Sequence, residues 1–512
     1  MSTEIFNLAQ HCVGRAAASA PDKTALVVVN DADRFEASER WSYAALDRAV
    51  RSVAAGLHAE GFVPGDRIIL RLPDSSEYAL VFFGAIAAGM VPIPISAQLT
   101  AAEARVLILD SEAAAIAQIG GLAISGIPVG CRALDEPALA RLKLAEPLAA
   151  FAATKADEPA YMIYTSGTTG RAKGVIHAHQ VALGRAPMYR DWMGLSAADT
   201  MLHAGAFNWS YTLGVGLVDP WACGATAVLY NGPKDVEVWP KLITTAEATL
   251  FAAVPSLFRQ MLKYCRLTPD SLPTLRHALA AGESLSPALL AEWQEATGKP
   301  IYEALGMSEI STFVSNHAGM PIRPGSPGKP QTGRAVAVLP LDEGTSPVPV
   351  GQTGLLAVHR SDRGMMRGYW RRPEEEKLVF RGDWLIGGDL ASFDADGYLW
   401  YHGRADDIMN VGGYRVSPLE VEAALASCPG IAEIAVAEHR VRDDVSVIAA
   451  YVVTNEVANV GQADILAFAA SRLAAYKRPK QIFFVPSLPR GANGKVLRRK
   501  LSGRVMVMQT LP

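Results

Sequence analysis

The 512-residue sequence lacks an excess of either charge, because 48 basic residues stand against 51 acidic ones and the formal net charge is −3. Without a basic surplus, the chain has no bulk field that would attract nucleic acid or an anionic membrane. Cysteine is also scarce. The five cysteines occur singly, and none belongs to a CxxC pair or to a His/Cys cluster at metal-ligand spacing. We therefore expect no nucleic-acid or membrane partner, and we expect a reducing, cytoplasmic compartment.

Targeting and membrane-spanning segments are also missing. The first residues, MSTEIFNLAQ, do not combine a basic stretch with an apolar one, so no secretory signal is expected. The 20 residues from Tyr78 to Ala97 carry no charge, which is close to the length that crosses a bilayer. However, Pro92 and Pro94 disfavour a helix after Met90. This run predicts a buried helix that turns at Gly89 and enters a short buried strand.

What the sequence does contain is typical of a globular protein with several domains, since half of its residues are apolar. Helical stretches rich in Ala and Leu alternate with short strands predicted at Ala25–Val29, Arg67–Leu72 and Thr226–Leu229, which favours α/β layering. Further along, DADGY (394–398) predicts a hairpin turn, because the later ligands of a calcium loop are missing. After Arg404, a turn, a helix capped at Ser417 and a strand indicate a small separate domain.

The densest local pattern is TSGTTGRAKG (165–174), which directly follows the predicted buried strand AYMIY. Its glycines allow positive φ, so consecutive backbone N–H groups can converge on phosphate oxygens. Four hydroxyl side chains add donors, and a lysine adds positive charge. The pattern is not a Walker A motif, in which Ser or Thr follows the lysine. It predicts a phosphate site rather than a polar linker. The predicted contacts are Thr165, Ser166, Gly167, Thr168, Thr169, Gly170 and Lys173.

This loop resembles the phosphate-binding signature of the adenylate-forming family, which includes acyl-CoA synthetases, aryl-acid ligases, peptide-synthetase adenylation domains and luciferases. Four further segments occur in the family's order. They are YEALGMSEIS (302–311), GGDLASFDADGYLWYHGRADD (387–407), GRADDIMNVGGYRVSP (403–418) and YKRPKQIFFVPSLPRGANGKVLRRKL (476–501). The resemblance covers nearly the whole chain and is strongest to benzoate and other aryl-acid CoA ligases.

The resemblance implies an α/β (α+β) fold with a large N-terminal multi-subdomain region of packed sheets and helices and a small mobile C-terminal α+β domain. The implied N-terminal AMP-binding domain, residues 1–403, holds the acid and ATP sites. Residues 404–408 form the implied hinge, with Asp406 at the hinge position. Residues 409–512 form the implied mobile catalytic domain.

Individual roles follow from the same resemblance. Glu309 corresponds to the acid that acts with Mg²⁺ beside the ATP phosphates, a role that suits a hard oxygen ligand, and Thr165 is the other implied metal ligand. Asp389 and Arg404 correspond to residues that hold the ribose or a phosphate. Lys495 corresponds to the lysine that bridges the substrate carboxylate and the α-phosphate, so Lys495 and Glu309 are the predicted catalytic residues. The other implied ATP- and AMP-binding residues are Gly282, Glu283, Glu303, Leu305, Gly306, Met307 and Ser308.

The sequence departs from the family at Leu305, where a tyrosine commonly stacks on adenine, so aromatic stacking is lost at this position. For CoA, the implied contacts are Gly412, Gly413, Tyr414 and Lys477. The segment 203–225 occupies the place of the family's aromatic substrate segment. Its implied acid-binding residues, together with one on a neighbouring strand, are Phe207, Trp209, Tyr211 and Ala281. Plain core packing remains an equal alternative for these side chains. His177 and His179 are interpreted as structural.

The implied activity is that of an acid–thiol ligase, an AMP-forming acyl-CoA synthetase with ATP, Mg²⁺ and CoA as cosubstrates. A carboxylate would attack the α-phosphate of ATP, and the CoA thiol would then displace AMP from the acyl-adenylate. An aryl or cyclic monocarboxylic acid is the expected substrate. The alternatives are a short or branched aliphatic acid, a carrier-protein thiol as acceptor, and a non-catalytic nucleotide-binding paralogue. We expect a monomer or a homodimer, and acylation of Lys495 would switch adenylation off by removing its charge.

Overall fold

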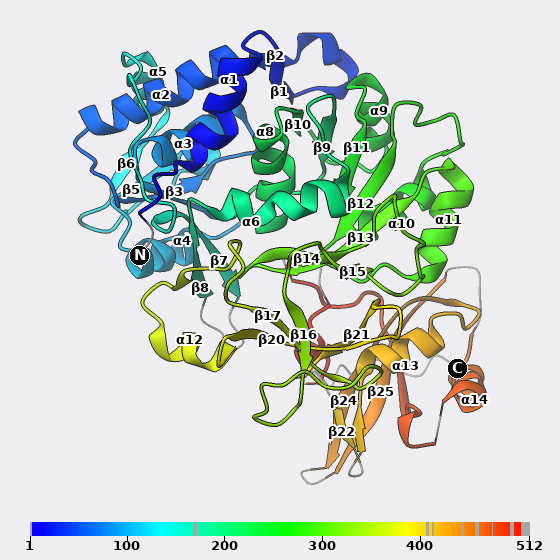
Figure 1. The fold of residues 1–512 in the computed structure, drawn as a ribbon. Helices are drawn as coiled ribbons and strands as arrows, with labels where there is room; N and C mark the ends of the chain where they lie inside the picture. Colours follow the sequence, from blue (N-terminus) through cyan, green and yellow to red (C-terminus); the bar gives the residue numbers. More distant parts are fainter. Residues whose placement is uncertain are drawn as a thin grey trace. The chain divides into compact units, whose positions relative to one another are not determined.

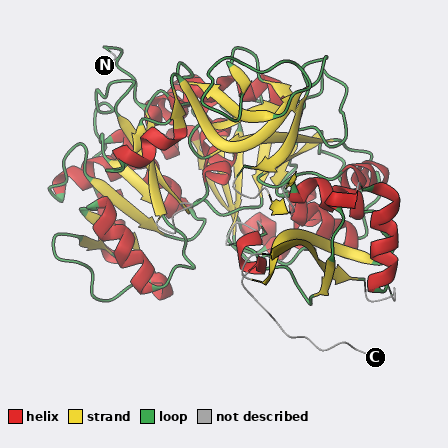
Figure 2. Ribbon diagram, turned by 90° about the horizontal axis from the view of Figure 1, so that it is seen from below, coloured by secondary structure: helices red, strands yellow, loops and turns green. Residues whose placement is uncertain are grey.

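The computed structural model describes residues 3–166, 172–405, 409–411, 414–442, 445–455, 460–473, 475–491 and 496–502 (Figure 1). The chain forms two compact units. Unit 1 contains Met1–Val336 and Val358–Leu385, and unit 2 contains Ala337–Ala357 and Ile386–Pro512. Helices pack beside strands, as Figure 2 shows, so the predicted α/β (α+β) class is confirmed. Within the described ranges, no helix has both the length and the apolarity needed to cross a bilayer.

The largest sheet of unit 1 has nine strands. In spatial order they are β15 (Lys329–Pro330), β14 (Ser311–Ser315), β13 (Ile301–Met307), β12 (His277–Ala281), β11 (Leu250–Ala253), β9 (Thr200–His203), β10 (Thr226–Tyr230), β1 (Thr24–Val29) and β2 (Glu39–Ser42). The six strands from β13 to β1 are parallel. β2 pairs antiparallel with β1 at one edge, and at the other end β14 pairs antiparallel with β13 and the edge strand β15 pairs antiparallel with β14. The central strands are short apolar runs because helices cover both faces of the sheet. This confirms the strands predicted near residues 25–29 and 226–229.

Two apolar layers enclose this sheet. On one face it packs against α9 (Val238–Thr245), α10 (Pro255–Tyr264) and α11 (Pro287–Thr297), which lie along one flank of the strands in Figure 1. The other face packs against α6 (Val181–Met188), the π-helical turns η4 (Tyr189–Met193) and η5 (Gly214–Val218), and α7 (Ser210–Leu213). The second layer contains Trp209, Tyr211 and Ala281, which the sequence assigns to the acid site.

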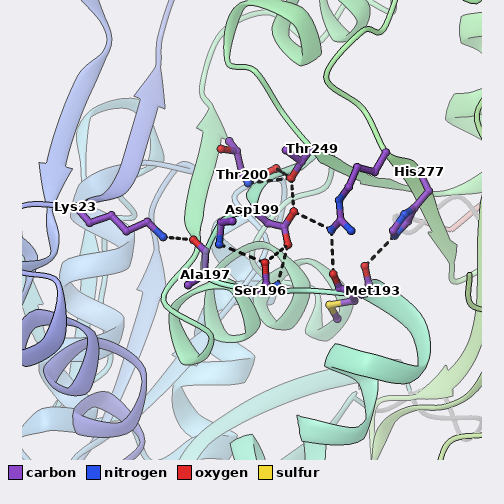
Figure 3. A network of polar contacts seen from close by, with 11 residues as sticks. Lys23, Met193, Ser196, Ala197, Asp199, Thr200, Thr249 and His277 are labelled. Carbon is purple, nitrogen blue, oxygen red and sulfur yellow. Dashed lines mark hydrogen bonds and ion pairs between the residues drawn. The ribbon is translucent and has the colours of Figure 1, made fainter.

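A polar network ties together the amino ends of β9, β11 and β12 (Figure 3). The Asp199 carboxylate accepts hydrogen bonds from the Ser196 amide at 2.8 Å, the Thr249 hydroxyl at 2.7 Å and the Arg276 guanidinium at 2.8 Å. His277 donates from Nε2 to the Met193 carbonyl at 2.8 Å. Since these residues stand at the start of parallel strands, the network fixes one edge of the sheet. The carboxyl ends of the strands form the opposite edge, where α/β sheets bind ligands.

Two smaller sheets complete unit 1. One is parallel, in the order β4 (Val91–Pro94), β3 (Arg67–Arg71), β5 (Ala115–Gln118) and β6 (Arg132–Leu134). The other contains β18 (Gly368–Tyr369), β8 (Ala172–Ala178) and β7 (Pro159–Ser166). Within the described residues, the remaining α-helices of the unit are α1 (Arg15–Ser19), α2 (Tyr43–Ala59), α3 (Ser76–Ala87), α4 (Ala101–Ser111), α5 (Glu136–Leu144), α8 (Asp219–Ala222) and α12 (Pro373–Val379).

The uncharged run at 78–97 folds as predicted. Helix α3 ends at Ala87, Gly89 has a φ of +77°, and β4 follows with all four of its residues buried. Glycine suits this turn because a positive φ strains residues that carry a side chain. The run is therefore a core element of unit 1, and its lack of charge reflects burial.

Unit 2 contains most of a five-stranded sheet, together with two smaller sheets that pack around a separate apolar core. Its strands are β16 (Val336–Leu339), β17 (Gly354–His359), β20 (Trp384–Phe393), β21 (Leu399–Arg404), β22 (Met409–Val411), β23 (Tyr414–Val416), β24 (Ile431–Arg442), β25 (Val445–Thr454) and β26 (Gln481–Phe484). A two-residue strand, β19 (Phe380–Arg381), precedes β20. The helices are α13 (Pro418–Leu425), α14 (Gln462–Arg472) and α15 (Arg498–Ser502).

Two local predictions in unit 2 have different outcomes. The predicted hairpin is confirmed, since β20 and β21 are antiparallel and Gly397 in their turn has a φ of +81°. Helix α13 begins at Pro418, as predicted, but Ser417 makes no capping hydrogen bond. Its hydroxyl instead donates to the His402 carbonyl at 2.6 Å. Ser417 therefore occupies the N-cap position, as predicted, but its side chain does not cap the helix because a tertiary acceptor competes for the hydroxyl.

Candidate functional site

The predicted phosphate loop connects β7 and β8, which form an antiparallel hairpin with Thr165 opposite Lys173. The loop therefore starts at the end of a strand, as the sequence predicts. Gly167, Thr168, Thr169 and Gly170 lie outside the described residues, and of Ser166 only the backbone is described. Tyr164, at the base of the loop, donates from its hydroxyl to Asp110 Oδ2 at 2.7 Å. This bond anchors the hairpin to α4.

Lys173 is enclosed by a segment that the sequence analysis did not single out. Its Nζ lies 2.8 Å from Glu375 Oε2 and 5.1 Å from the centre of the Tyr369 ring, a distance at which a cation is attracted to the aromatic face. The side chain of Lys173 is 12% exposed. Strand β18 pairs with β8, and the Trp370 amide donates to the Gly174 carbonyl at 2.7 Å. Backbone pairing thus holds the 369–375 segment against the hairpin.

Glu309 lies in the turn between β13 and β14, next to the same segment. Its Oε1 accepts a hydrogen bond from the Tyr369 hydroxyl at 2.7 Å, and its carbonyl accepts one from the Met366 amide at 2.7 Å. Burial, with the nearby Glu309 charge, raises the pKa of Tyr369, so its hydroxyl remains a donor. Tyr369 therefore touches both Lys173 and Glu309, which are 136 residues apart in the sequence.

The Glu309 carboxylate fits the magnesium role that the resemblance implies. Within the described part of the chain, its Oε2 has no hydrogen-bond or ion-pair partner and is open to a hard cation. The same part of the chain has no group of three or more His, Cys, Asp or Glu side chains that could hold a metal. A single free carboxylate oxygen suits Mg²⁺, which usually takes its other ligands from phosphates and water.

Two other acids assigned to nucleotide binding make structural contacts. Glu303, on β13, is 8% exposed and accepts a hydrogen bond from the Leu285 amide at 3.0 Å, and burial raises its pKa to about 7. Glu283 accepts hydrogen bonds from the amide and the hydroxyl of Ser256, each at 3.1 Å, near the start of α10. Glu303 thus joins β13 to the loop after β12, and Glu283 joins that loop to the start of α10, so both acids shape the carboxyl edge of the sheet.

The glycines of this edge are required by close packing. Gly282 has a φ of +91°, and a Cβ there would lie 2.6 Å from Cη2 of Trp209. A side chain at Gly306 would collide with the Ser311 carbonyl on the paired strand β14. Leu305 and Met307 flank Gly306 on β13, and Ser308, in the next turn, has its Oγ 3.5 Å from the Ser210 hydroxyl.

The four residues assigned to the acid pocket belong to two different apolar clusters. Trp209, Tyr211 and Ala281 share the layer between the sheet and α6, with the Trp209 and Tyr211 rings 5.4 Å apart. The Tyr211 hydroxyl lies 3.3 Å from each of two strand carbonyls. Phe207 packs instead against Tyr78, at 5.1 Å between ring centres, in the cluster that contains α3. The structure therefore brings three of these four residues together.

His177 and His179 are buried, in agreement with their structural interpretation. His177 stacks on Tyr161 with ring centres 4.8 Å apart, and His179 Nδ1 accepts a hydrogen bond from the Leu8 amide at 3.1 Å. Burial lowers the pKa of His177 to about 3 and that of His179 to about 4. Both rings are neutral at physiological pH.

In unit 2, Asp389 and Arg404 face each other across strands β20 and β21. Asp389 Oδ1 lies 3.6 Å from Arg404 Nη1 and accepts a hydrogen bond from the Tyr401 hydroxyl at 3.1 Å. Gly388 has a φ of +80°, and a Cβ there would lie 3.0 Å from Arg404 Nη2. The strand pairing brings the two residues together, and the sequence analysis missed Tyr401, which orients the carboxylate.

The remaining assigned residues are described only in part. Asp406, Gly412, Gly413 and Lys495 lie outside the described residues, and of Tyr414 only the backbone, in β23, is described. Lys477 forms an ion pair with Glu420 of α13. The roles predicted for these residues remain predictions.

Comparison with known proteins identifies the family. Residues 13–370 match the model of the AMP-binding enzyme, and residues 420–495 match that of the AMP-binding enzyme C-terminal domain. The chain belongs to the AMP-binding enzyme family. The family resemblance inferred from the sequence is thereby confirmed.

Family members from several bacteria are similar along most of their length. The chain is 31% identical to the 3-hydroxybenzoate–CoA ligase of Aromatoleum sp. (strain CIB), over 90% of this chain and 91% of that protein. It is also 31% identical to the benzoate–CoA ligase of Thauera aromatica, over 97% of this chain and 96% of that protein. The crystal structure of ATP-bound MatB from Rhodopseudomonas palustris superposes with a TM-score of 0.88 at 27% identity, covering 97% of this chain and 98% of that one.

Proposed function

We propose that this member of the AMP-binding enzyme family is an ATP-dependent carboxylic acid–CoA ligase that acts on an aryl monocarboxylic acid. One observation carries the proposal. Tyr369 joins Lys173 on the phosphate hairpin to Glu309 on the β13–β14 turn, so a cation and a carboxylate with an open oxygen stand beside the same residue. A nucleoside triphosphate with its divalent cation requires both kinds of group.

The substrate class follows from the named activities of similar proteins together with the apolar layer at the sheet edge. Two of the relatives are a hydroxybenzoate–CoA ligase and a benzoate–CoA ligase. Trp209 and Tyr211 present aromatic surface next to the small residue Ala281, which suits a flat ring. A short or branched aliphatic acid is the second candidate, since an apolar cluster forms most of this layer.

In the first step, a carboxylate oxygen of the acid forms a bond to the α-phosphorus of ATP, and the bond from that phosphorus to the bridging oxygen of pyrophosphate breaks. Two anions must meet, so fixed positive charge lowers the barrier. We assign this task to Lys495, with Lys173 on the departing phosphates. Bound Mg²⁺ would neutralise phosphate charge, and Glu309 Oε2 and the Thr165 hydroxyl are the groups that would hold it.

In the second step, the CoA thiol loses its proton and its sulfur forms a bond to the acyl carbon, while the bond from that carbon to the AMP oxygen breaks. AMP is a far better leaving group than the oxygen of a free carboxylate, so activation removes the obstacle to thioester formation. We assign Asp389 and Arg404 to the ribose or a phosphate of the nucleotide. Gly412, Gly413, Tyr414 and Lys477 are assigned to the CoA path.

The domain boundaries 1–403, 404–408 and 409–512, the rotation of the small domain about Asp406, and the monomeric or homodimeric state remain predictions. Acylation of Lys495 as an off-switch also belongs to this proposal. It predicts an acylated Lys495 peptide in mass spectra of protein from at least one growth condition.

The decisive test measures AMP release with ATP, Mg²⁺ and a panel of carboxylic acids, with and without CoA, and identifies the thioester by mass. The panel pairs benzoate and its hydroxy derivatives with cyclohexanecarboxylate and with aliphatic acids of similar size. CoA-dependent turnover that is fastest with the aryl acids is the expected result. Turnover with aliphatic acids alone would keep the reaction and overturn the aryl assignment. ATP binding without turnover on any acid would favour a non-catalytic nucleotide-binding protein, and transfer only to a carrier-protein thiol would replace CoA as acceptor.

A further inference from the structure

Lys173 already has an anionic partner within the protein. Its Nζ lies 2.8 Å from Glu375 Oε2, so the ammonium and the carboxylate form an ion pair. The other carboxylate oxygen, Oε1, lies 3.5 Å from Arg372 Nε, and Arg372 is itself paired with Asp110. Glu375 is therefore fixed by a second cation, while Lys173 is free to exchange one oxygen anion for another.

The surroundings of Lys173 favour such an exchange. The Lys173 ammonium lies 5.1 Å from the centre of the Tyr369 ring. An aromatic face attracts a cation but does not impose the directional geometry of a hydrogen bond. Lysine is a point charge on a flexible stem, so its head can move between acceptors with little change of backbone. Both paired side chains are mostly enclosed, with 12% of Lys173 and 23% of Glu375 exposed, so water screens the pair only partly.

We propose that Glu375 is an exchange partner for Lys173. Its carboxylate holds the ammonium while no polyphosphate is bound, releases it to the phosphates of ATP, and takes it back when pyrophosphate leaves. Glu375 is thus a positioning residue that touches Lys173 and not the substrate. The inference rests on the proposed function, because Lys173 can leave Glu375 only if a polyphosphate binds and takes its place.

The proposal predicts the sign of an effect that a merely structural ion pair would not produce. When a ligand must displace an internal partner, its apparent Kd equals its intrinsic Kd divided by the fraction of molecules in which that partner is already released. If the pair is formed in about nine-tenths of the molecules, removing the Glu375 charge tightens polyphosphate binding about tenfold. Loss of a structural contact would instead loosen Lys173 and weaken binding.

The experiment measures the Kd of inorganic pyrophosphate by titration calorimetry at fixed Mg²⁺ and ionic strength. Glu375→Gln keeps the size of the side chain and removes its charge, and it is expected to bind pyrophosphate about tenfold more tightly than wild type. Glu374→Gln is the matched control. Glu374 lies on the same helix, is 80% exposed and pairs with Lys377, so its charge can be removed without freeing Lys173. This control is expected to bind like wild type.

A double-mutant cycle with Lys173→Met separates exchange from simple repulsion between Glu375 and the ligand. The tightening by Glu375→Gln is expected to disappear in the Lys173→Met background. Tightening that persists undiminished there would overturn the proposal, as would weaker binding by the single variant while its melting temperature stays at the wild-type value. If Glu375→Gln melts early, Glu375→Asp serves instead, and a Kd within twofold of wild type is expected because its charge remains.

The outcomes also distinguish this inference from the proposed function. Expected binding by the variants, together with no acyl-CoA formation on any acid, would retain the exchange and overturn the ligase assignment. Acyl-CoA formation together with identical pyrophosphate binding by wild type and Glu375→Gln would retain the ligase assignment and overturn the exchange. If wild type binds neither ATP nor pyrophosphate, Lys173 has no second partner and the exchange is refuted.

Discussion

Replacing Tyr369 with phenylalanine tests the central contact of the site. The change removes one hydroxyl, which donates to Glu309 Oε1 at 2.7 Å, and keeps the ring beside Lys173. A hydrogen bond to a charged group contributes about 1.5–3 kcal/mol, and we take the lower value because Glu309 is only half-buried. About 1.5 kcal/mol corresponds to about tenfold in an equilibrium constant. We therefore expect the Mg²⁺ concentration for half-maximal AMP release to rise about tenfold, since groups that orient a metal ligand act on metal affinity in this range.

The assay titrates Mg²⁺ at saturating ATP and acid and compares Tyr369→Phe with Tyr43→Phe. The Tyr43 hydroxyl is buried and donates to the Ala225 carbonyl at 2.6 Å, in an apolar cluster that does not contain Tyr369. Its loss is expected to lower the melting temperature and leave the Mg²⁺ dependence unchanged. A Mg²⁺ titration of Tyr369→Phe that overlays wild type, or an equal shift in both variants, would refute the assignment of Tyr369 as the residue that orients Glu309.

Three further variants test other parts of the structure. Lys495→Ala is expected to slow adenylation on the order of a hundredfold or more, while thioester formation from preformed acyl-adenylate survives, and equal loss of both half-reactions would contradict its role. Asp219→Asn breaks a bidentate pair with Arg185, at 2.6 and 2.7 Å, whose side chains are 0% and 4% exposed. In urea unfolding, this change is expected to lower the free energy of unfolding by about 3–5 kcal/mol, because it leaves the Arg185 charge buried without a partner. A urea midpoint equal to that of wild type would contradict this reasoning. Glu303→Gln tests a pH dependence. Burial raises the Glu303 pKa from 4.5 to about 7, so between these values the folded state keeps a proton that the unfolded chain has lost, and stability falls as pH rises. At 1.36 kcal/mol per pKa unit, Glu303→Gln is expected to be more stable than wild type by roughly 3 kcal/mol at pH 8 and equally stable at pH 4. If the two proteins are equally stable at pH 8 as well, the pKa shift is refuted.

Much of the fold could be predicted because it is encoded by local patterns. Gly89 and the prolines after it limit the uncharged run to one helix and one strand, and the β-branched runs become central strands. The turn at Gly397 also follows from its own residues. These outcomes depend on backbone sterics and on burial of short segments, both of which act over a few residues.

The site was predictable only as separate pieces. The resemblance points to Lys173 and Glu309, yet the contacts of these two side chains come from residues without any signal of their own. Tyr369 and Glu375 lie in GYWRRPEEE, where three successive glutamates have the same local chemistry. The paired strands β18 and β8, with helix α12 following them, select Glu375 to meet Lys173. No local pattern distinguishes it from its neighbours.

Tertiary packing also decided between alternatives that the sequence left equal. Phe207, Trp209 and Tyr211 alternate along one segment, but a turn before α7 sends Phe207 to the cluster around α3 and the other two to the layer against the sheet. The Ser417 hydroxyl likewise donates to the His402 carbonyl on β21 and makes no hydrogen bond to its own helix. By itself the sequence determined the family, the central strands near residues 25–29 and 226–229, and the hairpin at residues 394–398, because these depend on residue type and spacing. The tertiary structure decided which side chains touch, because a contact between distant residues depends on the packing of the whole unit around it.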